Sequence, residues 1–147
     1  MVCYNFPMTS QEAFDELSYY TLSHKQEEFI HQYVVDAFAA QNADEGTKTI
    51  AIVFGLVGLY LHIEKKYSGK MVQKAHMQLA KYKEKLPKIV LPKDRGEITV
   101  FDVLNTPEGD QRDEKIEDWM HSVWQAYHAS YKIIDKFLTE VNVLSGK

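Results

Sequence analysis

Six histidines are the residues of this sequence with the widest chemical range, because an imidazole can bind a divalent metal or transfer a proton near neutral pH. Three of them, His31, His62 and His128, fall on separate segments with helical periodicity. If these three met inside a helical bundle, they would form a metal site. His121 and His128 are two helical turns apart, roughly 10.5 Å, so one ion cannot use both. The remaining two, His24 and His76, have charged or polar neighbours and are expected to meet solvent.

Polar residues also interrupt the apolar side of residues 23–41. In helical projection His31 lies inside the apolar arc, Asp36 lies at its margin, and Gln41 lies near its centre. They are five residues apart, so each is rotated by about 140° from the last and they cannot share one face. Either they bond neighbouring helices and loop backbone, which is the commoner role of buried polar groups, or they contribute to a ligand site.

Near the C-terminus, Trp124, His128 and Tyr131 form a ladder at helical spacing beside an apolar stripe. This ladder indicates either an aromatic–imidazole cluster at the boundary of the core or part of a binding site. Six residues are therefore candidates for binding a small ligand: His31, Asp36, Gln41, His62, Trp124 and His128.

Motifs that would specify one reaction are missing from the sequence. It has no phosphate-binding Walker loop, G-x-G-x-x-G, H-E-x-x-H, C-x-x-C or G-x-S-x-G. Cys3 is the single cysteine, which excludes an internal disulfide and a thiolate metal cage. Catalytic residues stay unknown, and whether the protein is an enzyme stays open.

The segment that must position these residues is the unbroken apolar run of residues 50–61. A helix that is apolar on every side must be covered on every side, and twelve residues fall short of the roughly 20 that span a bilayer. The run is therefore predicted to be the central helix of a soluble bundle. Gly55 and Gly58 line one strip of it with His62, which indicates close packing of another helix or a groove that leads to the imidazole.

Helical spacing and capping residues predict the other elements. Thr9 with Glu12 opens a helix that runs to about residue 22, and Thr99 with Asp102 opens a short one. The expected helices span residues 10–22, 23–41, 49–67, 70–86, 100–104 and 111–141, with a crossover at 87–92 bracketed by prolines. This pattern predicts one all-α domain over residues 1–147, an up-down helical bundle of four long helices plus a short one.

Charge and composition limit the partners. A formal net charge of −4 argues against non-specific binding to nucleic acid or to an anionic membrane. Lys65, Lys66, Lys70 and Lys74 form the nearest approach to a basic patch, and we interpret them as a solvated face. Because the first residues lack the pattern of a signal peptide, the expected location is cytoplasmic.

Three segments in order, His31 to Asn42, Arg95 to Leu104 and Asp118 to Tyr131, give the chain a family likeness. The sequence resembles an uncharacterised bacterial domain-of-unknown-function family (5946), a likeness that implies a helical fold and no established activity. More loosely, it resembles the DinB-like helical bundles, in which histidines from neighbouring helices hold a divalent metal. The pair at H-x-x-x-H spacing usual in those bundles is absent here.

Three functions follow as hypotheses. The first is a helical-bundle module that binds a small ligand, as yet unknown, or a partner, without catalysis. The second is a divalent-metal-dependent enzyme of DinB-like type, with His31, His62 and His128 as metal ligands and Asp36 orienting one of them. The third is self-association into a homo-oligomer, suggested by Trp119 and Phe137 beside the core stripe.

Overall fold

The computed structural model describes residues 8–23 and 29–141, and every regular element within these ranges is helical. This confirms the all-α prediction. The helices are α1 (Ser10–Ser23), α2 (His31–Gln41), α3 (Thr49–Lys65), α4 (Gly69–Leu79), α5 (Val100–Leu104), α6 (Asp110–Ala126) and α7 (Tyr131–Glu140), with the 3-10 turns η1 (Ala80–Lys85) and η2 (His128–Ser130).

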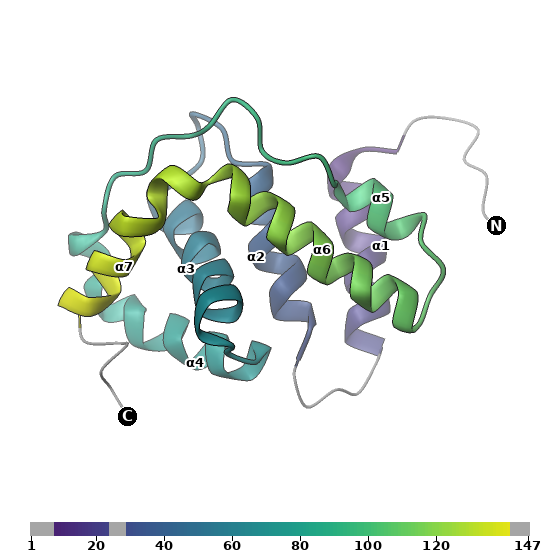
Figure 1. Ribbon diagram of the computed structural model, residues 1–147, viewed down its shortest axis with the longest axis horizontal. Coiled ribbons are helices and arrows are strands. Elements are labelled where there is room, and N and C mark those ends of the chain that lie inside the picture. The colour runs from purple at the N-terminus through teal and green to yellow at the C-terminus, as the bar shows by residue number, and fades with distance from the viewer. Residues whose placement is uncertain (1–7, 24–28, 142–147) are drawn as a thin grey trace.

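The apolar helix α3 is the centre of the bundle, as its composition predicts. It packs against α2, α4, α6 and α7, and side chains on all its sides, such as Val53, Leu59 and Leu61, are fully buried. In Figure 1, α2 and α3 lie side by side, α6 crosses them, and α1 with α5 covers one end. Among the described helices, none is long and apolar enough to cross a membrane.

The strip of small residues on α3 is where α2 makes its closest approach. A Cβ added to Gly55 would lie 3.1 Å from the carbonyl oxygen of Asp36, and one added to Gly58 would lie 1.8 Å from Asp36 Oδ2. The second distance is far below any van der Waals contact, so a side chain at residue 58 would have to displace the Asp36 carboxyl. Of the two interpretations of this strip, close helix packing is confirmed.

Local capping signals are confirmed at two helix starts. The amide of Thr9 donates to Glu12, and the amide of Glu12 donates back to the hydroxyl of Thr9. At α5 the amide of Thr99 donates to Asp102 Oδ2 at 2.9 Å. Each cap satisfies backbone donors that the first turn of a helix leaves without a partner.

Three predicted helices were too long. The helix expected from residue 23 begins at His31, because Phe29 has a left-handed φ of 57°. Residues 24–28, which include His24, lie outside the described part of the chain. The helix expected to reach residue 86 passes into η1 after Leu79, and Tyr82 has non-helical backbone angles. Tyr127 (φ −94°, ψ 17°) divides the final helix into α6 and α7, where its hydroxyl donates to the carbonyl of Ala40 at 2.6 Å.

The contact between Asp36 and Gly58 gives a double-mutant test. In an unhindered helix, Gly→Ala gains about 1 kcal/mol. Here Gly58→Ala is expected to lower the free energy of unfolding by about 2 kcal/mol or more, because the new methyl group displaces a buried carboxyl. In an Asp36→Ala background the same substitution is expected to become neutral or stabilising.

Urea denaturation of the four proteins of this cycle measures the coupling. Gly46→Ala is the control, since a Cβ there meets its nearest neighbour, Asp44 Oδ1, at an ordinary 3.4 Å. Equal effects of Gly58→Ala in both backgrounds would contradict the packing argument.

Candidate functional site

The most unusual polar group in the interior is the carboxyl of Asp36 on α2. Its side chain is 3% exposed; Oδ1 accepts a hydrogen bond of 3.2 Å from the amide of Gln32, and Oδ2 has no hydrogen-bond partner. Burial raises the pKa of Asp36 well above 3.8, and the bond from Gln32 opposes that rise in part. A neutral, protonated carboxyl is the form that this environment favours.

His76 on α4 lies beside Gln32 and Asp36 and forms a polar cluster with them. Its Nε2 lies 2.8 Å from the carbonyl oxygen of Phe54 in α3, so Nε2 carries the proton and donates it to that carbonyl. Nδ1 is then the acceptor, 3.5 Å from the amide nitrogen of Gln32. Burial lowers the pKa of His76, which favours the neutral ring. The expectation that His76 meets solvent was wrong: its side chain is 14% exposed.

Gln32, Asp36 and His76 therefore join α2, α3 and α4. The acid and the imidazole are both neutral, and Asp36 Oδ1 lies 3.9 Å from His76 Nε2. Because Nε2 already carries a proton and donates it to Phe54, it is not free to accept the proton of Asp36, so the pair serves to join the helices. Asp36 is covered, and it lines none of the hollows on the described surface. The sequence marks Asp36 as a polar residue on an apolar margin, but it does not place His76 beside it.

His62 lies in the last turn of α3 and makes a separate polar contact. Its Nδ1 is 2.8 Å from the carbonyl oxygen of Tyr67, and its Nε2 is 2.9 and 2.8 Å from the two carboxylate oxygens of Glu117 on α6. Each neighbour is an acceptor, so both ring nitrogens must donate and the ring carries a positive charge, which the C-terminal end of a helix stabilises. The ring of Tyr33 lies over it with centroids 4.0 Å apart. His62 also accounts for most of the lowering of the pKa of Glu117.

Gln41 uses its amide to hold the long connection before α5. Its Nε2 donates to the carbonyls of Ile98 (2.6 Å) and Arg95 (3.3 Å), and its Oε1 accepts from the indole of Trp119 at 2.9 Å. Arg95 in turn donates to the carbonyls of Gln41 and Ala43 at the end of α2. Of the two roles expected for Gln41, these bonds match the first, in which its side chain bonds loop backbone and a neighbouring helix.

The other candidates lie apart from one another. His31 Nδ1 is 2.9 Å from the hydroxyl of Thr21 on α1, and His128 is exposed in the turn between α6 and α7. Trp124 is 6% exposed and donates to Glu64 at 2.9 Å. Whether any of these residues binds a ligand stays a prediction.

The three histidines expected to share a metal, His31, His62 and His128, do not converge. His31 faces α1 and His62 faces α6, whereas His128 is exposed in the turn that follows Tyr127. Over residues 8–23 and 29–141, no group of three or more His, Cys, Asp or Glu side chains is arranged to hold a metal ion.

The residues behind the self-association hypothesis are buried within the chain. Trp119 is 0% and Phe137 is 3% exposed, so neither is available to a second copy. Both pack in the core because they lie on its apolar stripe, not beside it as expected.

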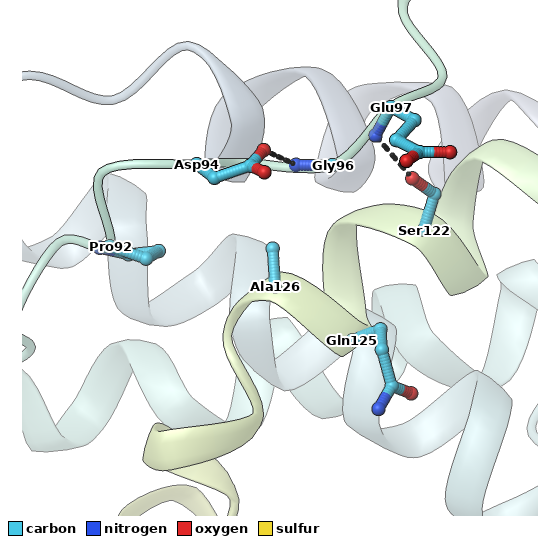
Figure 2. Close-up of a pocket in the computed structure, with 7 residues that line it drawn as sticks. All are labelled: Pro92, Asp94, Gly96, Glu97, Ser122, Gln125 and Ala126. Atoms are coloured by element: carbon cyan, nitrogen blue, oxygen red, sulfur yellow. Dashed lines mark hydrogen bonds between the residues drawn. The ribbon is translucent and has the colours of Figure 1, made fainter.

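Two of the hollows on the described surface adjoin the ends of α6. The first, about 550 Å³, lies between residues 92–97 and the end of α6 (Figure 2). Its polar groups already hold the backbone of this connection: Asp94 accepts from the amide of Gly96, and Ser122 Oγ accepts from the amides of Glu97 and Ile98 at 3.0 and 3.3 Å. The polar groups of this hollow therefore serve mainly to hold the connection before α5 against α6.

The second hollow, about 1050 Å³, we call the acidic groove. It is lined by one face of α1 (Asp15, Glu16, Tyr19 and Tyr20), by residues 104–108 and by Arg112. Tyr19 is 77% exposed, and three of the lining residues are acids: Asp15, Glu16 and Glu108. None of these residues was a candidate from the sequence, since they come from segments about 90 residues apart whose closeness only the fold creates.

Arg112 and Tyr20 form the rigid wall of the acidic groove. The guanidinium of Arg112, a residue only 8% exposed, donates to the carbonyls of Leu104 and Thr106 and lies 4.8 Å from the centre of the Tyr20 ring. The Tyr20 hydroxyl donates to Asp113 at 2.7 Å and accepts from the amide of Gly109 at 3.0 Å. Burial, and next the bond to Asp113, raise the pKa of Tyr20, so the phenol stays protonated.

The fold and these polar contacts define an all-α protein whose interior is crossed by hydrogen-bonded polar side chains. The chain belongs to the family of unknown function DUF5946, whose model matches residues 8–128, most of the sequence. This confirms the resemblance seen in the three segments. No curated protein and no solved structure matches the chain, and the looser likeness to DinB-like bundles is not shown.

The raised pKa of Asp36 predicts how stability depends on pH. The folded state holds this proton more tightly than the unfolded state, so stability is lost as pH rises above 3.8 toward the raised pKa. Asp36→Asn removes the titration and is expected to raise the free energy of unfolding at pH 8 by about 1 kcal/mol or more. The gain should shrink toward pH 4.

Chemical denaturation across that pH range, with Asp118→Asn on the exposed side of α6 as the control, measures the difference between variant and wild type. His76 is present in both proteins, so its opposite pH slope largely cancels. A difference independent of pH would contradict a protonated Asp36.

The pair of His62 and Glu117 predicts the opposite pH dependence. The pKa of Glu117 is lowered, so its contribution is present above 4.5 and lost as pH falls toward the lowered value. Glu117→Gln is expected to cost about 1 kcal/mol at pH 6, because the carboxylate is 39% exposed and partly screened.

Thermal or urea unfolding of Glu117→Gln at pH 6 and at pH 3.5 measures this loss, which should nearly vanish at the lower pH. Glu114→Gln, an exposed acid on the same helix, is the matched control. If both variants lost the same stability, the ion pair would have no special role.

Proposed function

We propose that this protein is a non-catalytic binding module that holds a short cationic segment of a partner protein in the acidic groove. The observation that carries the proposal is an open groove of about 1050 Å³ with an exposed tyrosine and an acidic rim. Arg112 is the one basic residue of its lining, and its guanidinium is already bound to two backbone carbonyls. It also lies 3.6 Å from Glu108, so it offsets one of the three acids and the lining keeps a negative formal charge from Asp15 and Glu16.

The chemistry of the groove favours a ligand with both positive charge and apolar surface. Tyr19 offers an aromatic face, on which a lysine or arginine gains about 0.5–1 kcal/mol at an exposed site. Asp15 and Glu108 lie on the two walls, one from α1 and one from the turn before α6, so charges on a bound segment would meet an acid on either side. The volume of about 1050 Å³ lies at the upper end of the range of about 300–1000 Å³ for small-molecule sites, so the groove has room for several side chains of a short peptide.

A binding measurement with a defined probe tests this function. A fluorescein-labelled heptapeptide of alternating Lys and Leu is expected to bind with a Kd of about 10–100 µM at low salt and to weaken severalfold at about 0.3 M salt. Tyr19→Ser, and separately Asp15→Asn with Glu108→Gln, should each weaken binding about fivefold, as measured by fluorescence anisotropy.

Matched variants elsewhere separate the groove from general effects. Val90→Ser removes an equally exposed apolar residue (80% exposed), and Glu140→Gln removes an exposed acid on α7. Both should bind as the wild type does, and a Glu–Leu heptapeptide should not bind. Equal affinity of groove and control variants would overturn the proposal.

A further inference from the structure

The basic residues of this chain are strongly segregated. Nine of the seventeen lysines and arginines lie between residues 65 and 93, with Glu84 as the one acid in that stretch. The stretch thus has a formal charge of +8, and since the whole chain has −4, the other residues carry −12. All nine of these basic residues are exposed lysines.

Part of this charge forms an ordered surface, which we call the lysine face: Lys70, Lys74, Met77 and Lys81. These residues follow one another at spacings of four, three and four along α4 and into η1, so they lie on one side of the helix. Met77 at its middle is 70% exposed. A flexible apolar side chain among lysines is suited to contact with an aromatic partner surrounded by acids.

The acidic groove has the complementary chemistry. It presents Tyr19 four residues from Asp15 on α1, with Glu108 on the opposite wall. Methionine against tyrosine and lysine against carboxylate are both favourable contacts. α1 packs on α2 and α5, whereas α4 packs on α2, α3 and η1, and Figure 1 places α1 and α4 toward opposite ends of the long axis.

We propose that the cationic segment bound in the acidic groove is the lysine face of a second copy of this chain. This inference rests on the proposed function and names its partner. Because the two surfaces lie toward opposite ends, each contact leaves one groove and one lysine face free, so the association is head-to-tail and open-ended. It is weak and sensitive to salt, because charge contributes much of the attraction.

Sedimentation velocity of the full chain tests the association. The weight-average mass of the wild type is expected to rise to about 1.5-fold the monomer value or more between roughly 5 and 300 µM at low salt. It should return to the monomer value at about 0.3 M salt. Lys132→Gln with Lys136→Gln, two exposed lysines on α7, is the control that should associate like the wild type.

Mixing two variants tests the head-to-tail geometry. A groove variant (Asp15→Asn, Tyr19→Ser, Glu108→Gln) and a lysine-face variant (Lys74→Gln, Met77→Ser, Lys81→Gln) should each be monomeric alone. Their equimolar mixture should form dimers and nothing larger, since the first supplies an intact lysine face and the second an intact groove. Circular dichroism of each variant confirms that it is folded.

The outcomes separate this inference from the proposed function. A wild type that stays monomeric while the Lys–Leu peptide still binds overturns self-association and leaves the groove as a site for another partner. A monomer that binds phosphatidylserine vesicles or polyphosphate through Lys74 and Lys81 overturns it in favour of an anionic partner. Association that persists in both variants shows that the interface lies elsewhere.

Discussion

The close approach of α2 and α3 is the constraint on which the rest of this structure depends. Without side chains at Gly55 and Gly58, the two backbones come near enough for the Asp36 carboxyl to rest directly on α3. Glycine within a helix costs about 1 kcal/mol relative to alanine, and a buried carboxyl with one oxygen lacking a partner costs more. The full burial of apolar side chains elsewhere on α3, such as Val53, Leu56 and Val57, offsets both costs.

Polar side chains from α2 and α3 then set the positions of the elements around them. His76 fixes α4 to a backbone carbonyl of α3, Gln41 fixes the long connection and α6, and His62 fixes α6 at the end of α3. Each of these groups is wholly or partly buried, so a misplaced neighbour would leave a donor or acceptor without a partner. An apolar core tolerates sliding of one helix on another, whereas these bonds specify one arrangement.

The sequence predicted the helices and their caps because periodicity and capping are local properties. It could not place the break at Tyr127, a residue whose hydroxyl bonds Ala40, 87 residues away. It identified Asp36 and Gln41 as polar residues in an apolar setting, but their partners His76 and Ile98 follow from tertiary packing alone. The acidic groove was missed for the same reason, since it exists only where Tyr20 binds Gly109 and Asp113. Sequence order therefore showed which residues were unusual and not which were neighbours.

A net charge of −4 is a poor guide to what either end of this molecule attracts. Charges on a protein surface are screened over about 8 Å at physiological salt, so a partner responds to the charges within its reach and not to their total. Around α4 a partner meets exposed lysines, and around α1 and the start of α6 it meets carboxylates. The expectation of no nucleic-acid or membrane partner was drawn from the total charge and stays a prediction; it describes the average surface rather than the lysine face. Arg112 pairs with Glu108 and offsets one of the three acids that line the groove, so Asp15 and Glu16 preserve the contrast between the two ends.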